Sequence, residues 1–208
     1  MSFTPCKLCE TKRAKRTCPG AGGEICPSCC GSARETTIDC PLDCTFLLEA
    51  RQHERRNPIP PGEVPNLDIR LNEDFLRQHE GLVLWLSASL FVAMGEARAV
   101  DSDAREALEA LIRTYRTLDS GLIYETRPQN PYAADLQEAL KKAVEEARQK
   151  FAEQSGMQTI RDKDVLGSLV FLQRMELETS NRRRRGRAFM QFLQGFLPMP
   201  ESPVALEL

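Results

Sequence analysis

The sequence predicts a mainly α protein in which a small cysteine-rich head precedes a C-terminal helical bundle. All eight cysteines lie within residues 6–44. Four prolines fall within residues 58–65, which favours an extended, semi-rigid linker. Beyond the linker, apolar residues recur at helical spacing. We therefore divide the chain into a head with its exit helix at 1–56, a linker at 57–66, a helical bundle at 67–197 and a tail at 198–208.

The composition limits what the chain can bind. Its 208 residues are 41% hydrophobic and 28% charged, and a net charge of -2 provides no global attraction to nucleic acid or membrane. The most apolar stretch, residues 81–95, is shorter than the roughly 20 residues that cross a bilayer, so it predicts part of a buried core helix, with an interfacial helix as the alternative. We expect no membrane partner. Residues 1–10 contain no basic segment followed by an apolar run, and we expect a cytoplasmic protein without a signal peptide.

The head needs something other than apolar burial to order it. Its large aliphatic residues up to position 44 are Leu8, Ile25, Ile38 and Leu42. Disulfides do not persist in a reducing cytoplasm, whereas one structural zinc supplies roughly 10–16 kcal/mol of folding free energy. Eight thiolates are the number that two closed four-ligand sites require, so the head is predicted to hold two Zn²⁺ ions. An iron–sulfur cluster is the alternative, because four thiolates also bind iron.

The cysteine spacing divides the ligands between two sites. Two Cys-x2-Cys turns can each direct two sulfurs at one ion, and together they complete a tetrahedral site. Cys40 and Cys44 are four residues apart at a predicted helix start, so they share one face. The first predicted site is Cys6, Cys9, Cys26 and Cys29, and the second is Cys18, Cys30, Cys40 and Cys44. Cys29 and Cys30 could exchange roles. His53 could replace one cysteine, but a surface position suits it better because the ligand count is already complete.

This arrangement resembles the interleaved two-zinc fingers of the MYND and HIT type. Those fingers pair an N-terminal Cys-x2-Cys with a later one and finish with ligands four apart on a helix, as Cys40 and Cys44 do here. The resemblance covers residues 6–44 and implies two-zinc coordination and a protein-docking role. The chain departs from the family at the solitary Cys18, at the adjacent Cys29-Cys30 and in lacking the histidine ligand. The Cys, Pro and Gly runs of the head are also similar to a pattern in uncharacterised bacterial cysteine-rich proteins, which implies no particular activity.

Each predicted helix has a start signal. Pro41 begins an exit helix that continues to about residue 56, because its missing N–H costs nothing in a first turn. Asn72 caps a helix that continues to about residue 98. The other signals are Ser102, Asn130, Pro131 and Asp162 at helix starts, Gly121 and Gly156 at helix ends, and Arg187 at the start of a short last helix. Short connections between long helices predict antiparallel neighbours in a bundle.

Two basic clusters offer possible phosphate contacts. The first cluster is Lys12, Arg13, Lys15 and Arg16, and the second is Arg182, Arg183, Arg184, Arg185 and Arg187. Neither run contains an aromatic residue, so a stacking platform for single strands is not supported. Five guanidinium groups in six residues repel one another unless anions lie nearby. Those anions could be phosphates or acids of this chain, such as Glu145, Glu146 and Glu153. A solvated turn with local ion pairs is the plainer interpretation.

Residues suited to catalysis are scarce, and we expect a non-catalytic protein. His53 and His79 are the only histidines, and no Gly-x-Ser-x-Gly, P-loop, dinucleotide loop or His-Glu-x-x-His occurs. The first hypothesis is an interaction or adaptor module whose head docks a protein partner and whose bundle binds a second partner or forms a homo-oligomer. The alternative is a regulator that contacts RNA or DNA phosphates through the basic clusters. A third, weaker hypothesis is a thiol redox sensor at Cys29-Cys30. Clusters on one face would favour nucleic acid, and neutralisation by acidic side chains would favour the adaptor.

Overall fold

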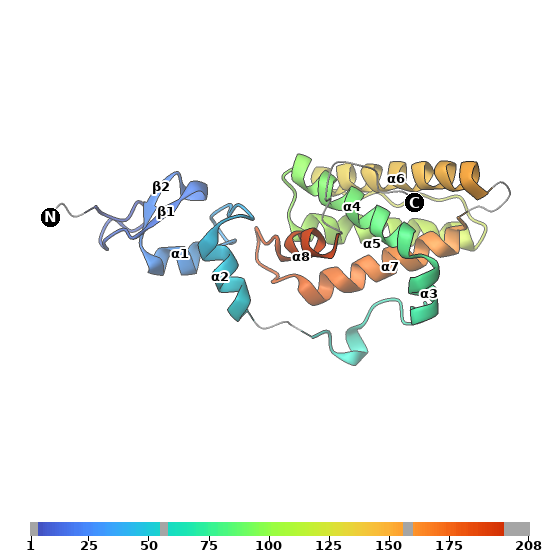
Figure 1. Ribbon diagram of the computed structural model, residues 1–208, viewed down its shortest axis with the longest axis horizontal. Coiled ribbons are helices and arrows are strands. Elements are labelled where there is room, and N and C mark those ends of the chain that lie inside the picture. The colour runs from blue at the N-terminus through green and yellow to red at the C-terminus, as the bar shows by residue number, and fades with distance from the viewer. Residues whose placement is uncertain (1–3, 55–57, 156–159, 198–208) are drawn as a thin grey trace.

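The computed structural model describes residues 4–54, 58–155 and 160–197. Figure 1 shows the N-terminal head beside one end of a helical body, which confirms the mainly α prediction. The head contains β1 (Arg16–Cys18), the 3-10 turn η1 (Pro19–Ala21), β2 (Gly23–Ile25), α1 (Pro27–Ala33) and α2 (Thr45–His53). The body contains α3 (Glu73–Gln78), α4 (Glu80–Glu96), α5 (Asp101–Asp119), α6 (Pro131–Ser155), α7 (Asp162–Thr179) and α8 (Ala188–Phe196).

The body is a bundle with one continuous apolar core. Helix α5 packs between α6 and α7, α4 lies against α6 and α7, and α8 closes one end over α4. The predicted core helix at 81–95 is α4, whose Leu86, Leu90 and Met94 are fully buried. Within the described ranges, no helix is both long enough and apolar enough to cross a membrane.

The helix signals of the body were mostly correct, with corrections at His79 and at the start of α7. The Asn72 Oδ1 atom accepts the Phe75 N–H at 2.8 Å, as expected of a cap. The predicted helix is interrupted at His79, however, and is therefore divided into α3 and α4. At the start of α7 the cap is not Asp162. Asp164 Oδ2 accepts the Arg161 N–H at 3.1 Å, because a carboxylate in the first turn can reach back to the residue before it. The predicted stop at Gly156 and the tail at 198–208 lie outside the described residues.

The predicted linker is fastened to the body at its C-terminal end. After a 3-10 turn, η2 (Pro61–Glu63), the chain is held by side chains of α5 and α7. Arg174 donates to the carbonyl of Asn66 at 2.8 Å, and Arg116 donates to Asn66 Oδ1 at 2.6 Å and to Asp68 at 2.8 Å. The part of the linker before Asn66 is therefore the covalent connection between head and body.

The head has a small apolar cluster separate from that of the body. Its buried members are three cysteines together with Ile25, Ile38 and Leu47. Leu42, counted in the sequence among the head's aliphatic residues, instead packs against the core of the body. Little of the head's interior is therefore aliphatic.

Candidate metal centre

The sulfur atoms of Cys6, Cys9, Cys26 and Cys29 form one compact group, in which all lie within 4.8 Å of one another. Tetrahedral coordination with Zn–S bonds near 2.3 Å places sulfurs about 3.8 Å apart, so small adjustments would bring these four around one ion. All eight cysteines are free thiols. The arrangement fits a four-thiolate metal site, and it brings together the four residues predicted for the first site.

Local structure explains how residues twenty positions apart meet. The β1–β2 hairpin pairs Arg16 with Ile25 and returns the chain to the first Cys-x2-Cys turn. The Cys26 N–H then points at the Cys6 sulfur at 3.2 Å. In the first turn of α1, the Cys29 N–H points at the Cys26 sulfur at 3.4 Å. Backbone N–H groups aimed at sulfur stabilise thiolates, which are the form that binds metal.

Ligand candidates lie at the starts of two helices: Cys26 is the N-cap of α1, and Cys44 is the N-cap of α2. The prediction of a helix beginning at Pro41 was wrong, because α2 begins at Thr45. Residues 41–44 form a turn closed by the Cys44 N–H and the Pro41 carbonyl at 3.2 Å, and Cys44 has an extended backbone. The sequence reasoning missed α1, although Pro27 at its first position is the same signal that was read at Pro41.

The thiols of the first group influence one another strongly. The Thr11 hydroxyl and the N–H groups of Lys12 and Thr11 lower the pKa of Cys9 to about 6. The Cys26 thiol, burial and the Cys9 thiol raise the pKa of Cys29 to about 12. Four sulfurs so close cannot all ionise unless a cation offsets their mutual repulsion. A divalent metal supplies that charge and binds the thiolates directly.

The other four cysteines surround a different space. No second group of three or more ligand atoms meets the same 4.8 Å limit among the residues that the structure describes. Cys18, Cys30, Cys40 and Cys44 nevertheless line one cavity of about 10 Å³, roughly the room of a single water-sized sphere. Burial raises the pKa of the Cys40 thiol, the nearby Glu35, Cys18 and Cys44 raise it further, and the Glu35 N–H opposes them. His53, the alternative ligand, is exposed near the end of α2.

The first basic cluster lies on the outer part of the head. Arg13 and Lys15 are exposed, Lys12 Nζ donates to Ser28 at 3.1 Å, and the Arg16 guanidinium lies 4.4 Å from the centre of the Phe46 ring. The second cluster is the loop between α7 and α8, at the end of the body that meets the head. The two clusters therefore occupy different parts of the molecule.

Two members of the second cluster are engaged by acids of the head. Arg183 pairs with Glu54 at 2.9 Å, and Arg187 pairs with Asp39. Arg182, Arg184 and Arg185 are exposed.

The expected acidic partners of this cluster have other contacts. Glu145 pairs with Arg148 at 3.3 Å, Glu146 with Lys142 at 3.6 Å, and Glu153 accepts from Gln149 at 3.1 Å. These side chains find partners three or four residues away on α6, which are their nearest neighbours on a helix surface.

Comparison with known proteins gives no match, whether with protein-family models, curated proteins or solved structures. The geometry of the chain is therefore the basis for inferring its function.

Proposed function

We propose that this chain is a zinc-stabilised, non-catalytic interaction module. The compact group of four sulfurs at Cys6, Cys9, Cys26 and Cys29 carries the proposal. Four thiolates leave no open coordination position, which is typical of structural zinc, whereas catalytic zinc keeps one position for water or substrate. The small cavity lined by the other four cysteines supports a second ion in the same head.

Metal content tests the two sites separately. Protein purified under reducing conditions is expected to hold two zinc ions per chain by elemental analysis and native mass spectrometry. The double variant Cys6→Ser with Cys9→Ser should lose one ion, and Cys30→Ser with Cys44→Ser should lose the other. Wild-type protein without metal would end the proposal. Iron with visible absorption would replace zinc by the iron–sulfur alternative.

A docking role is supported by the surface of the head. Leu8, inside the first Cys-x2-Cys turn, is 46% exposed, and a metal-bound turn would present this side chain rigidly. Exposed Arg13 and Lys15 follow it in the chain. We propose that the head binds a protein surface in which an apolar pocket is bordered by acidic side chains.

Co-purification from the native cells tests this docking role. A discrete protein should co-purify with the wild type and with Leu122→Ala, a matched exposed position on the body. It should be lost with Leu8→Ala while the zinc content stays unchanged. Equal retention by both variants would contradict docking through this turn.

A nucleic-acid-associated role is the second candidate, favoured by the three exposed arginines of the α7–α8 loop. Each phosphate contact contributes about 0.9 to the dependence of log affinity on log salt concentration for duplex DNA. Replacing Arg182, Arg184 and Arg185 with alanine should therefore reduce that slope by about 3. Arg113→Ala, which removes an exposed cation of α5, is the control. Absence of binding by the wild type at low salt would exclude this candidate.

A further inference from the structure

Glu35 occupies an unusual position in the head. It follows α1, lies in the chain between Cys30 and Cys40, and is completely buried. Its φ of +50° is in the left-handed region, which a glutamate rarely adopts without support from its surroundings. A buried carboxylate in such a backbone geometry needs specific partners.

The Glu35 carboxylate receives its hydrogen bonds from both parts of the molecule. Within the head, Arg51 of α2 donates to Oε1 at 2.5 Å. From the body, Asn181 Nδ2 donates to Oε2 at 2.7 Å and the Arg187 N–H donates to Oε1 at 3.0 Å. The Glu35 carbonyl also accepts the Arg185 N–H at 2.8 Å. One residue of the head therefore accepts hydrogen bonds from three residues of the α7–α8 loop.

The segment that carries Glu35 borders the second cysteine set. Arg34, which precedes Glu35, lines the same cavity as Cys30 and Cys40. The neighbouring Arg34 donates to the Cys30 sulfur at 3.7 Å. A metal ion held by Cys30 and Cys40 would fix both ends of the segment that carries Glu35. The backbone geometry that presents the carboxylate to the body would then depend on that ion.

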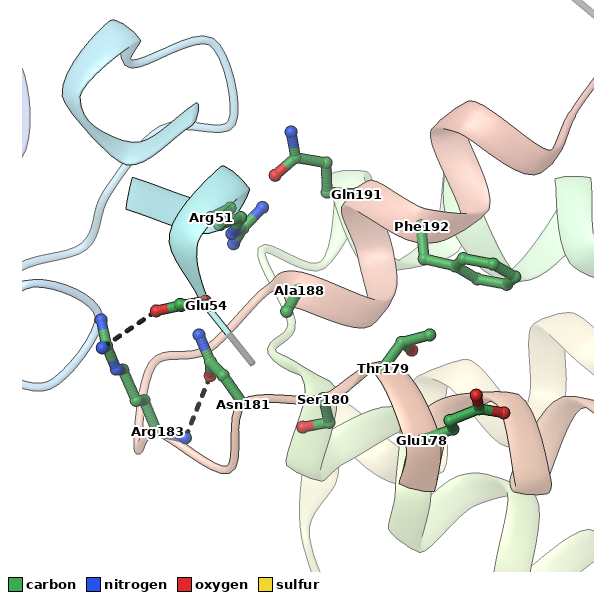
Figure 2. A pocket seen from close by; sticks show the side chains of 10 residues that line it. All are labelled: Arg51, Glu54, Glu178, Thr179, Ser180, Asn181, Arg183, Ala188, Gln191 and Phe192. Atoms are coloured by element: carbon green, nitrogen blue, oxygen red, sulfur yellow. Dashed lines mark hydrogen bonds and ion pairs between the residues drawn. The ribbon is translucent and has the colours of Figure 1, made fainter. Parts of the chain in front are cut away.

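The rest of the junction is poorly bonded. A cavity of about 390 Å³ lies between α2 and α8, with Arg51 and Glu54 on one side and Gln191 and Phe192 on the other (Figure 2). Among the described residues, seven buried side-chain polar atoms lack a hydrogen-bond partner, and five of them belong to residues that line this cavity. The five are Arg51 Nε, Arg51 Nη1, Glu54 Oε1, Arg183 Nη1 and Gln191 Oε1.

The cavity has room for water that these atoms can bind, and two of them also lie in ion pairs: Glu54 Oε1 is 2.9 Å from Arg183, and Arg183 Nη1 is 3.9 Å from Glu35. Few direct bonds therefore cross this part of the junction. Leu42 against the core of the body adds an apolar contact. The junction therefore depends strongly on Glu35 and on the pair between Asp39 and Arg187.

We propose that Glu35 is a metal-dependent latch between head and body, an inference that rests on the proposed zinc binding. Metal in the second cysteine set holds the latch closed. Its loss releases Glu35 and lets the head separate from the body. The arginines of the α7–α8 loop then lose Glu35, Glu54 and Asp39 as partners and become available to anions.

A distance measurement in the full-length protein tests the latch. Fluorophores attached through unnatural amino acids at exposed Lys15 of the head and exposed Lys142 of the body report their separation by energy transfer. Stepwise chelation of the wild type should lower the transfer as zinc leaves the second set. Cys40→Ser with Cys44→Ser should lower it in the same way. Unchanged transfer after loss of that ion would overturn the latch.

Glu35→Gln separates this proposal from the proposed function. The variant is expected to keep both zinc ions and to lose most of the energy transfer, while Glu24→Gln, which alters an exposed acid of β2, keeps both. A variant that retains its zinc and its transfer would overturn the latch and leave zinc binding intact. Absence of zinc from the wild type would instead overturn the proposed function.

Discussion

Asp101 makes the stability of the body depend on pH. Its carboxylate lies at the start of α5, is buried, and accepts the N–H groups of Phe189 at 3.0 Å and Met190 at 3.3 Å in the first turn of α8. Burial raises the pKa of Asp101 to about 7, the two N–H groups oppose that rise, and the nearby charges of Glu176 and Glu35 add to it. Arg105, which faces the same region, is paired with Glu176.

The sign and size of the effect follow from linkage. The folded state holds the Asp101 proton more tightly than the unfolded chain does, so protonation of Asp101 stabilises the fold. This stabilising free energy is complete below the ordinary pKa of 3.8 and is lost as pH rises towards 7. The complete loss corresponds to about 4 kcal/mol, of which about 2 kcal/mol falls between pH 5.5 and pH 8. Asp101→Asn removes this titration, although it also weakens the cap of α8.

Denaturant unfolding of the wild type and Asp101→Asn across this pH range checks the value. The stability of the wild type relative to the variant should fall by about 2 kcal/mol from pH 5.5 to pH 8. Metal release at low pH affects both proteins and cancels in the difference. Asp119→Asn, at the exposed end of α5, is the surface control. A difference that does not vary with pH would refute the assigned protonation.

Two further predictions concern packing and charge in the body. Gly167→Ala would place a methyl group 2.4 Å from Phe75 and should destabilise the fold by about 1–3 kcal/mol in denaturant unfolding, whereas Gly195→Ala meets no atom within 4 Å and should be neutral or slightly stabilising. Glu176→Gln breaks a buried bidentate pair with Arg105, at 2.7 and 2.8 Å, and should cost about 3–5 kcal/mol; a loss below 1 kcal/mol, with Glu109→Gln as control, would contradict this.

The fold was largely predictable because its signals are local. Helical periodicity predicted α5, α6 and α7, and the cap at Asn72 was correct. The break at His79 had no comparable signal, because a change of helix direction depends on packing against the body. The short hairpin of the head was also missed, since β1 and β2 pair three residues each and lack an alternating apolar pattern.

The candidate site was predictable in composition but not in its surroundings. Cys-x2-Cys spacing is a local property, and it correctly grouped Cys6 with Cys9 and Cys26 with Cys29. Glu35 was not recognised, because one glutamate between cysteines resembles any surface acid in sequence. Its partners Asn181 and Arg187 lie 146 and 152 positions away. Only the fold reveals that part of the arginine run faces an acid of this same chain.

Metal binding explains how the head can be ordered with so few buried aliphatic side chains. Of the four large aliphatic residues that the sequence has up to position 44, Leu8 is 46% exposed and Leu42 packs against the body. Ile25 and Ile38 remain, joined by Leu47 and surrounded by cysteines. Burying a few aliphatic side chains contributes about 1.5–3 kcal/mol each, and each residue fixed in the fold costs about 1–2 kcal/mol of backbone entropy. Such a cluster does not by itself offset the entropy of some forty residues, which supports our proposal that the thiolates bind metal ions. If the head kept its backbone hydrogen-exchange protection after complete chelation, this reasoning would be wrong.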